Sequence, residues 1–229
     1  LLLPTLACLL CALLSRPRPA GAATRAKFST AEALQRQSDL LQATNDAALL
    51  LFSDDEDLDS LATRALGGVG TVTDVDEVDV WRNHGSSEVG LLCTQVYSWS
   101  KHYASGYFTP SSTVAYRAHL PGWEEQLASG QCVDTLTRSL SPQEQELLRL
   151  QGLKAVLAVP IIFRSGFWGF IRLAARNDNH TWGKGEETIL RSVGLLIAAT
   201  MQRRQIQEAL SESEERFRDV TMAAGEIIW

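Results

Sequence analysis

Two adjacent apolar runs within residues 155–175 constrain the fold of this chain more than any other feature. Both are rich in β-branched and aromatic residues, and only the short turn at Arg164-Ser165-Gly166 separates them, a pattern that predicts a β-hairpin. Because nearly every position is apolar, neither face of the hairpin can be left in water. We therefore expect the hairpin at the centre of a sheet, with helices on one face. What the other face contacts is the functional question.

The composition limits the chain to about one domain and excludes several function classes. A chain of 229 residues that is 45% hydrophobic can hold one domain of about 150 residues with flanking elements. The net charge of −6 argues against nucleic-acid binding, which usually requires a basic stripe. The sequence contains no Gly-rich nucleotide-binding box, phosphoacceptor histidine motif or nucleophile elbow, and its histidines are isolated. We expect no catalytic and no metal-binding residues in this chain.

The N-terminal segment, residues 1–14, is an apolar run that stops at a basic, proline-containing stretch. A helix that crosses a bilayer needs about 20 apolar residues, so this run fits the end of a transmembrane helix with the basic residues on its cytoplasmic side. A signal peptide and an artefact of where the sequence starts are the alternatives. Residues 15–30, rich in Pro, Ala, Gly and Arg, are interpreted as a linker.

Two helices are expected between the linker and the sheet. The first begins near residue 31, after an N-cap at Ser29-Thr30. Its apolar residues form a half-complete heptad seam that can pack on its own domain or on a second copy of the chain. The positions seven apart in this seam are Leu34, Leu41 and Ala48. The second helix runs from Asp55 to Leu66 and is expected to end at Gly67-Gly68.

The middle of the chain alternates short strands and short helices. Strands are predicted near residues 78–81 and 88–99, joined by a turn at residues 83–86. Residues 101–114 have no periodicity and form a long loop of the kind that can cover a pocket. A short helix, an extended piece and a helix with Ser141 as N-cap follow. This order predicts an α+β fold with an antiparallel β-sheet and helices packed on one face.

A long helix is predicted from Glu186 to about Thr221, on the order of 50 Å. Its later part carries a seam suited to a parallel dimer, with apolar residues at alternating spacings of four and three and one polar interruption at Ser213. The apolar positions of this seam are Ile206, Leu210, Phe217 and Val220. We therefore expect a homodimer formed mainly through this helix, with the helix that begins near residue 31 as a second candidate contact.

Several motifs in fixed order point to a family. They are Pro121-Gly122-Trp123, the run from Gly152 to Pro160, Phe167-Trp168-Gly169-Phe170-Ile171, and Thr181-Trp182. With these motifs the chain resembles a GAF domain of the type found in bacterial sensor histidine kinases and diguanylate cyclases, over about residues 35–210. The resemblance implies a GAF domain with flanking helices at 31–210, and residues 211–229 resemble the truncated start of a PAS domain.

The resemblance implies a regulatory sensor and signal-transmission module. The expected parent is a sensor histidine kinase of a two-component phosphorelay, which would carry the phosphotransfer chemistry outside this chain. Its GAF domain would be cytoplasmic, at the face of the bacterial inner membrane. The alternatives are a ligand-free dimeric relay, and the input domain of a diguanylate cyclase or of a transcription regulator.

Two ligands known in the family fit the sequence poorly. Bilin-binding relatives attach the chromophore through a Cys that is usually followed by His, whereas here Cys93 precedes Thr94 and Cys132 precedes Val133. Cyclic-nucleotide-binding relatives carry an Asn-Lys…Phe-x-x-x-Asp-Glu pattern, and only its second half is approximated around Trp182. We expect neither covalent bilin nor cyclic nucleotide, and no other cofactor.

A small-molecule pocket lined by aromatic residues is the remaining ligand hypothesis. Its candidate residues are Tyr97, Trp99, His102, Trp123, Cys132, Asp134 and Trp168. Trp168 is expected on the sheet face opposite the long helix that begins after Trp182. If that face meets a cavity the domain senses a ligand, and if it meets packed side chains the domain relays a signal.

Overall fold

The structure, a computed structural model, describes residues 20–53, 57–86, 88, 90–102, 112–163, 166–178 and 180–226. The apolar run at residues 1–14, the turn at 164–165 and most of the loop at 101–114 lie outside these residues. Residues Leu40–Trp229 form one structural unit, which holds the sheet, and Leu1–Asp39 form another. Within the described residues, no helix has the length and apolarity that a membrane span requires.

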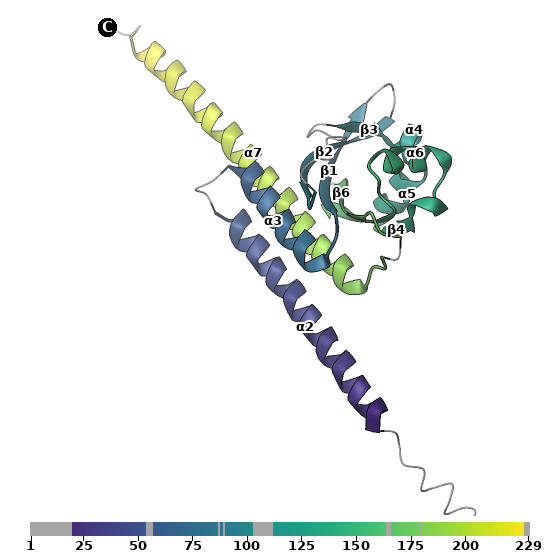
Figure 1. Ribbon diagram of the computed structural model, residues 1–229. Coiled ribbons are helices and arrows are strands. Elements are labelled where there is room, and N and C mark those ends of the chain that lie inside the picture. The colour runs from purple at the N-terminus through teal and green to yellow at the C-terminus, as the bar shows by residue number, and fades with distance from the viewer. Residues whose placement is uncertain are drawn as a thin grey trace, which may run out of the picture. The chain divides into compact units, whose positions relative to one another are not determined.

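A six-stranded antiparallel sheet is the centre of the domain, in the order β3-β2-β1-β6-β5-β4 (Figure 1). The predicted hairpin is confirmed as β5 and β6, and β6 pairs on its other side with β1, so the hairpin lies in the middle of the sheet. The strands are β1 (Glu77–Ser86), β2 (Gly90–Ser100), β3 (Thr113–Ala115), β4 (Val133–Leu136), β5 (Ala155–Phe163) and β6 (Gly166–Ala175).

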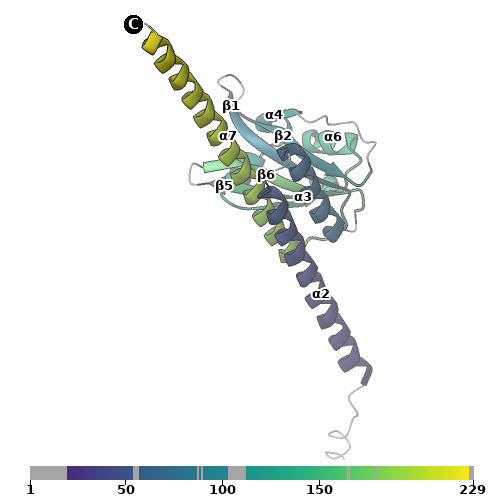
Figure 2. The ribbon, with the colours of Figure 1, turned by 90° about the vertical axis from the view of Figure 1, so that its left-hand side faces the viewer.

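Helices cover both faces of the sheet (Figures 1 and 2). Three long helices belong to the first face, which we call the helix face: α2 (Ala20–Leu51), of which the part from Leu40 packs in the core, α3 (Leu58–Thr73) and α7 (Lys184–Glu226). The opposite face carries short helices: α4 (Tyr116–His119), α5 (Trp123–Ala128) and α6 (Pro142–Leu150), with the single turn η1 (Thr137–Ser139) after β4. The predicted α+β fold is confirmed, with the short helices added on the second face.

The helix face is held by aliphatic packing between α7, α3 and the central strands. Leu190, Val193 and Ile197 of α7 are fully buried in this core. Gly194 lies so close to the sheet that a Cβ there would meet Ile171 at 2.9 Å. The predicted long helix is confirmed, and its buried residues belong to the part before Met201.

The predicted end of the second helix at Gly67-Gly68 is wrong, because α3 continues to Thr73. Gly67 and Gly70 instead leave room for the Trp99 side chain of β2, whereas a Cβ on Gly68 would meet no atom within 4 Å. A Cβ on Gly67 would meet the Trp99 Nε1 at 3.0 Å, and a Cβ on Gly70 would overlap the indole ring. The helix ends with Asp74 in the left-handed conformation, at φ 51°. A contact distant in sequence therefore explains residues that locally resemble a helix stop.

Two other predicted boundaries differ from the structure. α2 begins at Ala20 rather than near residue 31, so part of the predicted linker is helical, in line with the high helix propensity of its alanines. The predicted turn at residues 83–86 lies within β1, which ends at Ser86, and β2 begins at Gly90. Asn83 is fixed in the strand because its side chain donates to the Phe167 carbonyl at 3.3 Å and accepts from the Tyr116 hydroxyl at 2.9 Å.

Candidate functional site

The seven predicted pocket residues do not come together in one cavity. Tyr97, Trp99 and Trp168 pack with the core of the helix face, whereas Trp123 is buried on the opposite face. His102 is exposed after the end of β2, with its Nε2 3.2 Å from an Asp76 oxygen. The other two, Cys132 and Asp134, lie at the edge strand β4, treated below.

Trp168 is on the helix face, so the prediction that it lies opposite α7 is wrong. A register shift in the β5–β6 ladder pairs Ile161 with Gly169 and Ile162 with Phe167, which leaves Trp168 without a partner in β5. Such a bulge changes the side of the sheet to which the next side chains point. The Trp168 ring packs edge-on against Phe163, with centroids 6.2 Å apart, and the Arg82 guanidinium lies 5.9 Å from its centroid.

The face opposite α7 is filled by an aromatic cluster. Trp81 stacks on Phe170 with ring centroids 5.8 Å apart, and Trp123 meets Phe170 edge-on at 6.1 Å. Tyr116 also packs against Phe170, at 6.4 Å. The Trp123 indole nitrogen donates to a Glu144 carboxylate oxygen at 2.5 Å, which ties α5 to α6. Trp123 is therefore a core residue, and this part of the face holds packed side chains.

A buried ion-pair network lies beside the aromatic cluster. The Arg172 side chain is 5% exposed, and its Nε donates to the Asp79 carboxylate at 2.8 Å while its Nη1 donates to Gln151 at 3.3 Å. Gln95 donates to the second Asp79 oxygen at 2.7 Å, and the Trp81 ring lies 5.8 Å from the guanidinium.

Glu77, the first residue of β1, extends this network to the end of the β1 and β6 strands. One of its oxygens lies 3.8 Å from Arg172 and the other lies 3.4 Å from Arg176. Burial raises the pKa of Glu77, and the nearby Arg172 opposes that shift. Buried charges of this kind must be paired, so the network joins β1, β2, β6 and the residue after α6 as a structural unit.

The cysteines are shielded rather than activated. Burial raises the pKa of Cys93 to about 12, and its thiol donates to the Val114 carbonyl at 3.6 Å. Burial, together with a hydrogen bond to Glu187, raises the pKa of Cys132 to about 11. A thiol reacts as its thiolate, so neither residue is set up as a nucleophile at neutral pH. In the part of the chain that the structure describes, no group of three or more His, Cys, Asp or Glu side chains could hold a metal ion.

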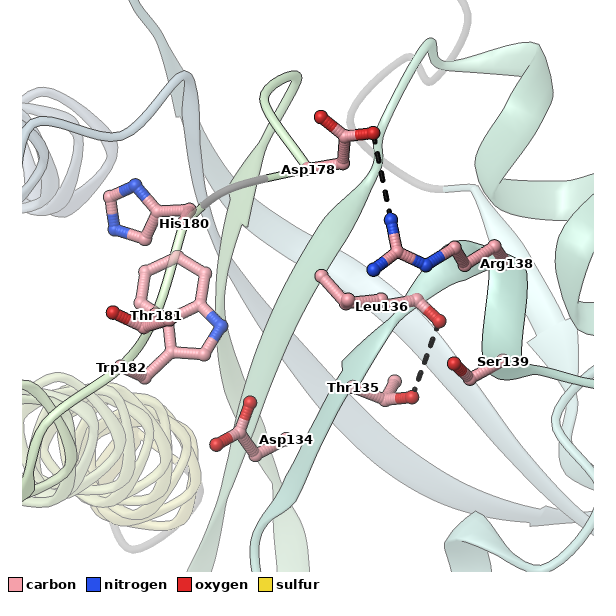
Figure 3. Close-up of a pocket in the computed structure, with 9 residues that line it drawn as sticks. All are labelled: Asp134, Thr135, Leu136, Arg138, Ser139, Asp178, His180, Thr181 and Trp182. Atoms are coloured by element: carbon pink, nitrogen blue, oxygen red, sulfur yellow. Dashed lines mark hydrogen bonds and ion pairs between the residues drawn. The ribbon is translucent and has the colours of Figure 1, made fainter.

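An open groove of about 610 Å³ lies at the β4 edge of the domain (Figure 3). It lies between β4 with the following η1 on one side and the segment between β6 and α7 on the other. Of the seven predicted residues, only Asp134 lines it. The lining residues are Asp134, Thr135, Leu136, Arg138, Ser139, Asp178, His180, Thr181 and Trp182.

The groove combines charged and aromatic groups. The Arg138 guanidinium lies 3.6 Å from an Asp178 carboxylate oxygen. The His180 ring packs against the Trp182 ring, with centroids 4.2 Å apart. Asp134 is an exposed residue, yet the partial desolvation of its carboxyl by neighbouring groups raises its pKa.

Sequence reasoning missed most of this groove. Arg138, Asp178 and His180 are ordinary surface residue types, separated by about 40 positions along the chain. The sequence feature that could have indicated a site is the polar segment at residues 176–181. This segment lies just before Trp182 and the long helix. It does not reveal the groove, because the position of β4 at the sheet edge follows only from the strand order.

The comparison with protein families decides the classification. The model of the GAF domain matches residues 57–201, which is most of the chain. The chain belongs to the GAF domain family. The matched range begins at the N-cap of α3 and ends within α7, so it includes the whole sheet, α3 and the part of α7 that is buried against the sheet, but not α2.

A relative of this GAF domain protein is a methanogenesis regulatory histidine kinase, FilI, of Methanothrix harundinacea (strain 6Ac). The two are 25% identical over 207 residues, which is 86% of this chain and 23% of that kinase. The chain thus spans about a quarter of the length of this relative.

Solved structures with the same fold include GAF domains from different contexts. The GAF domain of a phosphoenolpyruvate-protein phosphotransferase from Coxiella burnetii matches with a TM-score of 0.57 and 12% identity, over 76% of this chain and 98% of that one. A phycoerythrobilin-bound GAF domain from a cyanobacterial phytochrome matches with a TM-score of 0.55 and 14% identity, over 76% and 97%. At these identities the likeness shows the fold alone.

Proposed function

We propose that this GAF domain is a regulatory input and signal-transmission module of a histidine kinase, with α7 as the element that carries the signal. The relation to a regulatory histidine kinase supports this parent over a diguanylate cyclase or a transcription regulator. As further parts of this proposal, a PAS domain follows α7, and residues 1–14 anchor the protein to the cytoplasmic face of a membrane.

One observation carries the proposal: α7 changes character along its length. The first part is buried against the sheet through Leu190, Val193 and Ile197. The later part leaves the sheet and exposes large apolar side chains, with exposed fractions of 61% at Ile206, 58% at Leu210 and 74% at Phe217. A single helix of 43 residues thus joins the domain core to an exposed apolar stripe, which suits the transfer of rotation or register shifts.

The stripe on α7 is proposed to form a parallel homodimer. Ile206, Leu210 and Phe217 follow the four-three spacing of a coiled-coil seam, and the side chain of the fourth predicted position, Val220, lies outside the described residues. On α2, Leu34 is 62% and Leu41 is 60% exposed, whereas Ala48 is partly buried, which leaves the second predicted seam a weaker contact.

The double variant Ile206→Glu/Leu210→Glu should be monomeric, where the unaltered chain is dimeric. The reason is that two buried carboxylates in a coiled-coil seam lose hydration without gaining a partner. Light scattering after size-exclusion chromatography measures the mass directly. Gln207→Glu is the matched control, because Gln207 is exposed and lies off the seam, so this variant should remain dimeric. A dimer that survives the double substitution would disprove this seam.

Signal transfer through α7 can be tested by changing its register. In a chimera that joins this chain in helical register to the catalytic part of a histidine kinase, we insert one to seven alanines after Met201. Two or five inserted residues turn the seam to roughly the opposite side of the helix and should change autophosphorylation about 5- to 150-fold, and seven should restore it, because seven residues return the seam to nearly the same face. A smooth decline with insertion length, without recovery at seven, would contradict the proposal.

The bilin-bound neighbours raise the question of a chromophore in this chain. We expect no covalent bilin on Cys93 or Cys132, because burial holds the pKa of both thiols high and packed aromatic side chains occupy the sheet face around Phe170. Co-production with biliverdin or phycocyanobilin, followed by zinc-induced fluorescence on a denaturing gel, measures attachment. A fluorescent band that Cys93→Ala or Cys132→Ala abolishes would refute this expectation.

A further inference from the structure

The groove at the β4 edge is separate from the filled aromatic face and from the seam on α7. Leu157 of β5 belongs to the helix-face core, and Asp134 is its partner in the ladder, so Asp134 points to the same side of the sheet. β4 has only four residues and lies at the sheet edge, and Asp134 is exposed there. The resulting groove, about 610 Å³, has the size of a small-molecule site.

The charges that line the groove do not cancel. Arg138 and Asp178 lie 3.6 Å apart and compensate each other. The Asp134 carboxylate has no hydrogen bond or ion pair with any residue that the structure describes, so it is the excess charge of the lining. A negative charge at a partly desolvated position favours a positively charged ligand.

An aromatic ring lines the same groove as this carboxylate. Asp134 lines the groove from β4 and Trp182 lines it from the segment before α7, and Figure 3 shows both in the left half of the view, with Arg138 and Ser139 in the right half. The Trp182 ring is partly buried and is supported by the His180 ring, with centroids 4.2 Å apart. An indole face attracts cations, and a carboxylate next to it adds a direct charge interaction. This pair of groups is suited to an ammonium group.

We propose that this groove binds a small organic cation, with its ammonium group between the Asp134 carboxylate and the Trp182 indole. The hydroxyls of Ser139 and Thr181 and the Arg138–Asp178 pair would then contact the polar remainder of the ligand. The proposal assigns binding only and includes no chemical step.

The position of Trp182 gives the groove a connection to α7. Trp182 lies two residues before the first residue of α7, Lys184, and also packs against the helix-face core. Ligand contact at this ring would therefore act on the start of the long helix. A regulatory role of the cation rests on the proposed function, whereas binding itself does not.

Calorimetric titration of the chain with choline tests the binding, with 3,3-dimethyl-1-butanol as the neutral molecule of the same shape. The titrations are run at pH 8, where an imidazole is ordinarily neutral. We expect choline to bind with a dissociation constant below about 10 mM and the neutral analogue to bind at least about tenfold more weakly. A choline-induced change in the chemical shift of the Trp182 indole N–H would place the ligand at this ring. The signal is assigned by its loss from the NMR spectrum of Trp182→Phe.

Asp134→Asn should weaken choline binding about tenfold, because it removes the charge and keeps the shape. Asp46→Asn is the matched control: Asp46 is an exposed aspartate on α2 that accepts a hydrogen bond from Gln42, and its loss should leave the affinity unchanged. Circular dichroism should show both variants folded, because neither carboxylate is buried. The proposal is overturned if choline does not bind, if choline and the neutral analogue bind equally, or if Asp134→Asn binds as tightly as the unaltered chain. Any of these results leaves the insertion test on α7 unaffected, so the two proposals fail separately.

Discussion

Replacing Arg172 with leucine should lower the free energy of unfolding by about 3–5 kcal/mol, the usual cost of breaking a buried ion pair. The leucine removes the cation and leaves the Asp79 carboxylate, 3% exposed, without its charged partner. Glu77 also loses Arg172, whose Nη2 lies 3.8 Å from a Glu77 carboxylate oxygen, and keeps Arg176 as a basic neighbour in this network. Urea denaturation followed by tryptophan fluorescence measures the loss.

Lys101→Gln is the control for the Arg172 substitution. Lys101 pairs with Asp74 at 2.9 Å, but both side chains are largely exposed, so breaking this pair should cost less than about 1 kcal/mol. The double variant Arg172→Leu/Asp79→Leu should be more stable than the sum of the single losses indicates, because each single variant leaves the other charge unpaired. Additive losses would show that the two residues are not coupled.

The loss caused by Arg172→Leu should also depend on pH. Burial already raises the pKa of Glu77, and Arg172 is the main group that opposes this shift. Without Arg172 the folded state holds the Glu77 proton more tightly than the unfolded chain does, so stability falls as pH rises through the folded-state pKa. The difference in unfolding free energy between the variant and the unaltered chain should therefore be larger at pH 8 than at pH 5. An equal difference at both values would contradict this account.

Gly70→Ala should destabilise the domain by about 1–3 kcal/mol, even though alanine is the better helix former. A Cβ at this position would overlap the ring of Trp99, a residue of β2 whose side chain packs against α3. Thermal and chemical denaturation both measure the effect.

Gly68→Ala is the matched substitution on the same helix. No atom lies within 4 Å of a Cβ at Gly68, so alanine should stabilise the domain there by about 0.5–1 kcal/mol. Combining Gly70→Ala with Trp99→Leu should remove most of the penalty relative to Trp99→Leu alone, because the smaller side chain leaves room for the methyl group. If Gly68→Ala and Gly70→Ala shift stability in the same direction, the close approach of Trp99 is not what requires glycine.

Local sequence patterns predict those elements that depend on interactions between residues close together in the chain. The hairpin in residues 155–175 follows from two apolar runs and a turn. α6 follows from Ser141 and Pro142, and the structure adds the reciprocal hydrogen bond from the Ser141 backbone to Glu144 at 2.8 Å. These features depend on residues that are neighbours in the chain.

The errors arose where distant residues decide. Gly67 resembles part of a helix end, yet it lies inside α3 and leaves room for Trp99, about 30 positions later. Trp168 was placed on the wrong face because a single bulge, visible only in the strand ladder, reverses the alternation. The charged residues of the groove come together only through the strand order. A periodicity argument contains none of this information.

In the described residues, the sheet face opposite α7 is covered by side chains of the domain itself. Trp81, Tyr116, Trp123 and Phe170 pack against one another there, which supports transmission rather than sensing on that face. In our proposal for the groove, ligand sensing takes place on the other side of the sheet, at the start of α7.

The pairing of β1 with β6 has a consequence for synthesis of the domain. The Asp79–Arg172 pair closes a loop of 93 residues, and it joins strands at the centre of the sheet. On the ribosome, β1 and β2 emerge first and can form their hairpin, but β1 keeps an open edge until β6 has been made. Open edges of apolar strands are sites of aggregation, and contacts this distant form slowly. The nascent domain is therefore most exposed to misassociation during the interval in which β3 to β5 are translated.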